Sequence, residues 1–98
     1  MAYNFWAEKH GEEVVQEIQE AVAGSRFVEV FPISFEKEIT ELGISVPMKA
    51  ASEPGFELEF DRVMRFFMVE KGFSIVDLYT GLVVDKSELP VLAKRIVQ

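Results

Sequence analysis

One segment, residues 65–79 with the sequence RFFMVEKGFSIVDLY, constrains the fold of this chain more than any other. It is apolar on both sides of a turn expected at residues 70–72, and apolar on both faces if it is extended. A small domain must cover such a segment twice, once with its own core and once with something else. The segment therefore predicts either a covered sheet centre or a surface that contacts another protein.

The composition is that of one globular domain spanning residues 1–98. Hydrophobic residues make up 49% and charged residues 28% of the chain, so disorder is not expected. No apolar run approaches about 18 residues, and no basic segment followed by an apolar one opens the chain, so neither a membrane span nor a signal peptide is expected. The absence of cysteine excludes disulfides and thiolate sites and fits a cytoplasmic protein.

The net charge of −7 is unevenly distributed along the chain. Residues 1–59 contain twelve acidic and four basic residues, whereas residues 60–98 contain five and six. An acidic surface disfavours direct binding to nucleic acid or to anionic lipid, because both require basic residues. The charge indicates either a solubilising amino-terminal helix or an acidic face that meets a basic partner.

The first half of the chain is predicted to be mixed helix and strand. A helix is expected from Asn4, as N-cap, to about residue 23, because apolar residues recur there at helical spacing. Its other side is acidic and includes Glu12, Glu13, Glu17 and Glu20. A strand inside a sheet is expected over residues 26–33 with Pro32 at its exit, then a short helix over 35–42 capped by Ser34, and an irregular loop over 44–55.

The second half is predicted to be mainly strand. Residues 56–60 alternate between apolar and acidic and indicate a half-buried strand. Residues 61–71 fit either a strand in a meander, which is the preferred interpretation, or a helix. Strands over residues 73–79 and 82–84 follow, separated by a turn at Thr80-Gly81. A last helix starts after Ser87 and carries Lys94 and Arg95 near its end.

These elements predict an α+β fold. We expect a two-layer sandwich, with a mostly antiparallel sheet and the amino-terminal and carboxy-terminal helices packed on one face. Such a sheet leaves its other face open.

No motif for catalysis, metal or nucleotide is present, and no cofactor is expected. His10 is the only histidine, so the chain alone cannot build a multi-histidine metal site. Asp77 lies among apolar residues and is the best candidate for a buried carboxylate. If buried it needs a partner, and Arg62 or Arg65 on an adjacent strand is the expected one.

The leading hypothesis is a non-enzymatic, regulatory or protein-interaction domain that forms a homodimer. In the meander interpretation Met64, Phe66 and Met68 point to the open face of the sheet and anchor the interface. If residues 61–71 are helical instead, the outward residues become Phe66 and Val69.

Two other classes of function stay open. The first is an acidic inhibitor or immunity-type protein, in which Glu12, Glu13, Glu17 and Glu20 imitate nucleic-acid phosphates. The second is a small-ligand site or weak enzyme around Asp77, with Arg65 and Tyr79 beside it.

Overall fold

The computed structural model describes residues 2–8, 18, 25, 27–35 and 38–97. Its strands and longer helices are β1 (Ala2–Glu8), β2 (Glu29–Phe35), β3 (Glu38–Pro47), α2 (Phe56–Arg65), β4 (Ser74–Asp77), β5 (Leu82–Val83) and α3 (Leu89–Val97). Three short helical segments lie between them: the 3-10 segments η1 (Met48–Ser52) and η3 (Lys86–Glu88), and the π-helical segment η2 (Phe66–Glu70).

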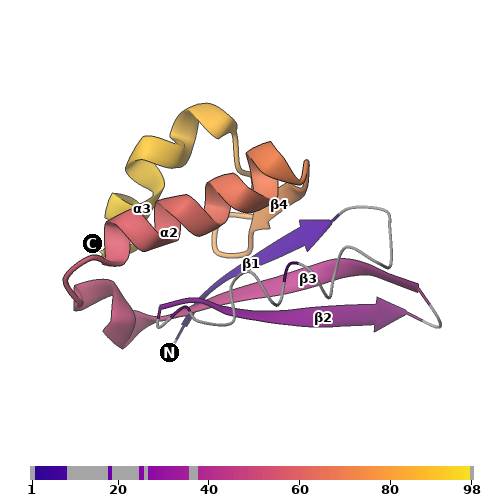
Figure 1. Cartoon of the computed structure of the whole chain (residues 1–98), viewed down its shortest axis with the longest axis horizontal. Helices are drawn as coiled ribbons and strands as arrows, with labels where there is room; N and C mark the ends of the chain where they lie inside the picture. Colours follow the sequence, from indigo (N-terminus) through magenta and orange to yellow (C-terminus); the bar gives the residue numbers. More distant parts are fainter. Residues whose placement is uncertain (1, 9–17, 19–24, 26, 36–37, 98) are drawn as a thin grey trace.

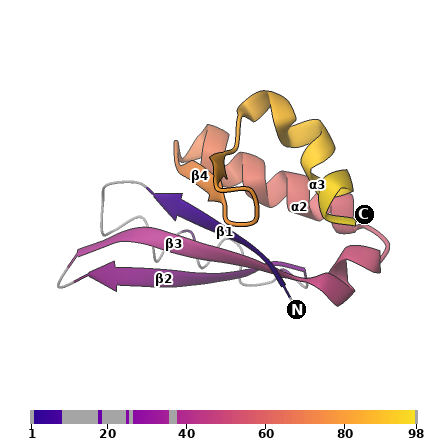
Figure 2. The ribbon, with the colours of Figure 1, turned by 180° about the vertical axis from the view of Figure 1, so that it is seen from behind.

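The five strands form one antiparallel sheet in the order β2-β3-β1-β4-β5, so β1 is the central strand. Helices α2 and α3 lie over one face of this sheet, as Figure 1 and the view from behind in Figure 2 show. The predicted α+β two-layer sandwich is therefore confirmed.

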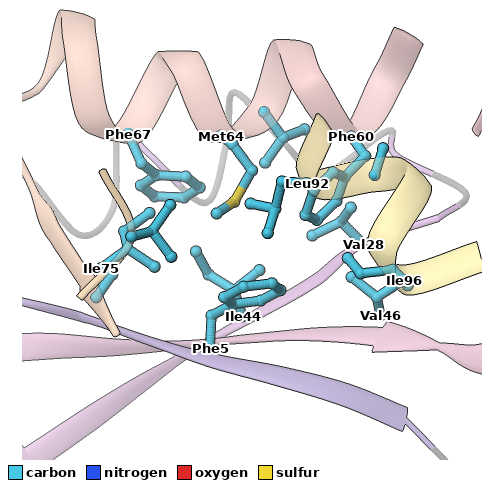
Figure 3. Close-up of a cluster of buried hydrophobic side chains, with 14 of the residues drawn as sticks. Phe5, Val28, Ile44, Val46, Phe60, Met64, Phe67, Ile75, Leu92 and Ile96 are labelled. Atoms are coloured by element: carbon cyan, nitrogen blue, oxygen red, sulfur yellow. The ribbon is translucent and has the colours of Figure 1, made fainter. Parts of the chain in front are cut away.

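The core fills the space between the sheet and the two helices. Side chains of a strand alternate between its faces, and the inward set of β1 includes the fully buried Phe5 and Ala7. In β3, Ile44 and its alternate neighbours are buried in the same way. The residues that helix α2 buries against the sheet recur at helical spacing: Phe56, Phe60, Val63 and Met64. Figure 3 shows the two layers meeting at Phe5, Ile44, Val46, Phe60, Met64, Phe67, Leu92 and Ile96.

The predicted helix start at Asn4 is wrong, because residues 2–8 form the central strand. The sequence AYNFWAE alternates, with Tyr3, Phe5 and Ala7 on the core side. The rest of that predicted helix lies outside the described residues, apart from Ile18, which is helical and fully buried.

The prediction for residues 26–55 is also largely wrong. The strand there is β2, which lies at the edge of the sheet rather than inside it. Pro32 lies within β2 rather than at its exit, and an edge strand tolerates proline because it does not need every amide as a hydrogen-bond donor. The expected short helix over 35–42 is wrong: Phe35 ends β2, and residues 38–42 belong to β3, which pairs with both β2 and β1. The expected loop over 44–55 is the end of β3 followed by η1.

Residues 56–70 are helical, as α2 followed by η2, so the preferred meander is wrong and its helical alternative is right. Phe56, Phe60, Met64 and Phe67 are all buried, at steps of three and four residues. Gly55 precedes α2 with a φ of 85°, a conformation that glycine adopts without strain. The strict alternation of residues 56–60 was misleading because Leu58, the middle one of the three apolar residues, is exposed to solvent.

The last third of the chain agrees with the prediction. Strand β4 falls within residues 73–79, β5 within 82–84, and the turn between them contains Gly81 at a φ of 75°. The final helix is present as α3, but the predicted cap at Ser87 is wrong, because Ser87 lies inside η3, which leads into α3. Asp85 is the N-cap of η3: it accepts a hydrogen bond from the Ser87 amide, and Glu88 completes a capping box.

Candidate functional site

An apolar row crosses the sheet on the face away from α2 and α3. The central residue is Trp6, which points opposite to the buried Phe5 and Ala7. Trp6 is paired with Gly43 of β3 and Val76 of β4, and these pair in turn with Phe31 of β2 and Val83 of β5. Directly paired residues share a face of the sheet. We call this set the apolar row: Phe31, Gly43, Trp6, Val76 and Val83.

Large members of the apolar row reach solvent. Trp6 is 36%, Phe31 46% and Val83 65% exposed. The ring of Phe31 covers Gly43 so closely that a Cβ atom at position 43 would overlap it. Gly43 therefore leaves room for the Phe31 ring over β3, which keeps the apolar row continuous from β2 to β1.

Polar residues flank the apolar row on both sides. Two residues along β1 in one direction, Glu8 pairs with Glu41 of β3 and with Ser74 of β4, and Glu41 pairs in turn with Ile33 of β2; we call this the Glu8 row. Two residues in the other direction, Asn4 pairs with Ser45 of β3, which pairs with Glu29 of β2; we call this the Asn4 row. An apolar centre with a mainly polar rim is the layout of a protein–protein contact surface.

The Glu8 row carries unfavourable electrostatics in the isolated chain. Glu8 and Glu41 are directly opposed carboxylates on one face of the sheet, an arrangement that destabilises a strand pair. Within the described part of the chain, Oε2 of Glu41 is the one buried side-chain oxygen or nitrogen atom that makes no hydrogen bond. A further negative charge placed against this row would be costly.

The edges of the sheet are poorly suited to pairing with another strand. Edge strand β2 contains Pro32, and edge strand β5 has only two residues. Proline and short length are two ways in which proteins prevent edge-to-edge association. Of the surfaces that the described strands present, the face away from α2 and α3 therefore suits a contact better than the edges do.

A second cluster lies at the end of β4, around the buried Asp77, which is 1% exposed. Its Oδ1 accepts hydrogen bonds from the backbone amides of Tyr79 (2.8 Å) and Thr80 (3.2 Å). Its Oδ2 accepts one from the Tyr3 hydroxyl at 2.5 Å and lies 3.6 Å from Nη2 of Arg95. Both oxygens are thus engaged, and the carboxylate fixes the β4–β5 turn to β1 and α3.

This cluster raises the pKa of Tyr3 from 10.0 to about 12. Burial is the main cause, and the hydrogen bond to Asp77 and the negative charge of that carboxylate add to it, against an opposing effect of Arg95. The neutral hydroxyl is therefore held as a donor to Asp77, which suits a structural contact rather than a proton-transfer site.

The raised pKa of Tyr3 predicts a loss of stability in alkali. Its stabilising effect is fully present below pH 10.0, the pKa of an unperturbed tyrosine, and is lost as pH rises towards about 12, since the unfolded chain then releases this proton more readily. Tyr3→Phe should remove this part of the pH dependence. The chain has two tyrosines, so the Tyr79→Phe variant reports Tyr3 alone in a titration of tyrosinate absorbance. A midpoint near 10 would contradict the account.

The structure separates the residues predicted as an interface. Met64 and Met68 are buried in the core, so the expectation that they project from an open sheet face is wrong. Phe66 is half-buried, packs against the core and lies under the Nζ of Lys71, 5.5 Å from the ring centroid. Val69 is exposed, as the helical alternative expected. Because this segment is helical rather than extended, none of Met64, Phe66 and Met68 lies on the open face of the sheet.

The other predicted residues are only partly brought together. Glu12, Glu13, Glu17 and Glu20 lie outside the described residues, so the acidic face stays a prediction. Asp77 is buried as expected, but its cationic partner is Arg95 of α3, not Arg62 or Arg65. Arg65 instead pairs with Asp61 on the surface of α2, at 2.7 Å. The open-face residues Trp6, Phe31 and Val83 were missed; alternation in residues 2–8 was the one signal that pointed to Trp6.

Comparison with known protein families, characterised proteins and solved structures found no match to this chain. None of the described helices is long and apolar enough to span a membrane. Among the described residues, no group of three or more histidine, aspartate or glutamate side chains is placed to hold a metal ion.

Proposed function

We propose that this domain acts by protein contact through the open face of its sheet, and that it is a homodimer. The observation that carries the proposal is the apolar row, which crosses all five strands with Trp6 at its centre. Tryptophan is among the residues most often found at the energetic centre of interfaces. The carboxylate at Asp77 is fully engaged in structural contacts, which favours a binding role over a catalytic one.

The distribution of exposed apolar side chains supports this surface. Among the described residues, exposed large apolar side chains on the helices are scattered: Leu58 and Val91 lie on α2 and α3, and Val69 on η2, while Leu78, Tyr79 and Leu82 lie in and beside the β4–β5 turn. Single exposed residues of this kind are ordinary on soluble domains. The apolar row, by contrast, is continuous across strands, and a continuous patch indicates an interaction site. The cytoplasmic location expected from the lack of cysteine stays a prediction.

A charge at the centre of the apolar row is expected to dissociate the dimer. Trp6→Glu buries a carboxylate in the contact, which should weaken self-association at least tenfold and give the monomer mass in light scattering behind a sizing column. Leu58→Glu is the matched control, because Leu58 is 82% exposed on α2, away from the sheet. It should leave the dimer intact.

Circular dichroism is needed to show that each variant is folded. If Trp6→Glu fails to fold, Val83→Glu tests the same apolar row at a position that is 65% exposed. A wild-type chain that remains monomeric at every concentration would overturn the homodimer, as would a dimer that Trp6→Glu and Val83→Glu leave unchanged.

A further inference from the structure

We infer that two copies of this chain pack face to face about a two-fold axis that runs along the apolar row, so that the Glu8 row of each copy meets the Asn4 row of the other. This inference rests on the proposed homodimer and adds the arrangement of the two sheets. It follows from the register of the strands and from the charges that flank Trp6.

The position of Trp6 limits the possible arrangements. Trp6 lies on the central strand of the five, in the middle of the apolar row. A two-fold axis in the plane of the contact that passes through this point places Trp6 against Trp6 of the second copy. Two such axes place the apolar row of one copy against the apolar row of the other. One runs along the apolar row and the other runs along the strands. Both give the aligned packing that is usual for two stacked sheets.

The flanking rows distinguish the two axes. An axis along the strands places Glu8 against Glu8 of the second copy, beside Glu41, whose buried Oε2 already lacks a donor. Facing like charges in an interface is unfavourable by several kcal/mol. An axis along the apolar row brings no two carboxylates face to face: it places Glu8 against Asn4 of the second copy, Glu41 against Ser45 and Glu29 against Ile33. Amide and hydroxyl groups can donate hydrogen bonds to these carboxylates, so the charges favour this axis.

The area of the sheet sets the expected strength of the contact. The five strands have seven, seven, ten, four and two residues. At about 3.3 Å per residue and about 4.8 Å between strands, they present a face of roughly 480 Å². Two such faces bury about 1,000 Å², near the lower limit for a specific interface. A second copy therefore fits the surface, and the dimer should dissociate on dilution.

Chemical crosslinking between single cysteines tests the axis, because the natural chain contains no cysteine. Asn4→Cys and Glu8→Cys each place one thiol on an exposed flank of β1. The two positions are about 13 Å apart along the strand, at about 3.3 Å per residue. A short bis-maleimide is added to each variant alone and to an equal mixture of the two, at a concentration where light scattering shows a dimer.

The inferred axis predicts that the mixture crosslinks several-fold more than either variant alone. Strong crosslinking of Glu8→Cys alone would overturn the inference and place the axis along the strands, while leaving the homodimer standing. A dimer in which none of the three samples crosslinks would overturn the inference by placing the interface elsewhere. A monomeric mass for wild type and both variants at every concentration overturns the homodimer itself, so the two failures are distinguishable.

Discussion

Replacing Phe60 with alanine is expected to lower the free energy of unfolding by about 3–5 kcal/mol. Phe60 lies at the centre of the aromatic core, with its ring centroid 5.5 Å from that of Phe56 and 5.8 Å from that of Phe5. It therefore joins α2 to the central strand of the sheet. Removing its ring leaves a cavity between the two layers, since neither layer can close over it without moving the other.

Denaturation by urea, followed by circular dichroism, measures this loss. The matched control is Leu58→Ala on the same helix, which should change the free energy of unfolding by about 0.5 kcal/mol or less, because Leu58 is 82% exposed. A loss below about 1 kcal/mol for Phe60→Ala would show that the two layers do not depend on this ring.

Removal of the Asp77 carboxylate is expected to have the second-largest effect. Asp77→Ala should lower the free energy of unfolding by about 2–3 kcal/mol, because a hydrogen bond to a charged group is worth about 1.5–3 kcal/mol and the half-buried Tyr3 hydroxyl loses its acceptor. Asp77→Asn should cost less, since its side-chain oxygen can still accept from the amides of Tyr79 and Thr80.

The control for Asp77 is another aspartate–arginine pair in the same chain. Asp61 accepts from Arg65 at 2.7 Å, a shorter distance than that between Asp77 and Arg95, but both partners are partly exposed. Surface pairs contribute about 0–1 kcal/mol, so Asp61→Ala should be nearly neutral. Equal losses for Asp61→Ala and Asp77→Ala would contradict the view that burial of Asp77 decides its importance.

The fold class could be predicted from the sequence because it depends on the overall content of helix and strand. The prediction of individual helices and strands failed where two sequence patterns were present in the same residues. Residues 56–60 alternate as a strand does, but Phe56, Phe60 and Met64 also follow helical spacing, and the longer pattern decided the structure. At the amino terminus, Asn4 resembles an N-cap, yet the alternation around Phe5 is what the structure follows.

The candidate surface could not have been predicted from local patterns. Trp6, Gly43 and Phe31 become neighbours only through the register of β1, β3 and β2, which the sequence alone does not specify. The cationic partner of Asp77 could not be predicted for a related reason. Arg95 reaches it from α3, so the pair depends on how the last helix packs against the sheet. The apolar neighbours of Asp77 in the sequence did predict that this carboxylate would be buried and would need a cationic partner.

The central claim is that Trp6 lies in a contact between two copies of the chain. Because Trp6 is the only tryptophan, quenching of its fluorescence by acrylamide, measured over a dilution series, reports this contact directly. We expect Trp6 to be protected from acrylamide at high protein concentration and to become several-fold more accessible on dilution, as the molar mass falls from dimer to monomer. Equal quenching at every concentration, with a constant monomer mass, would contradict it.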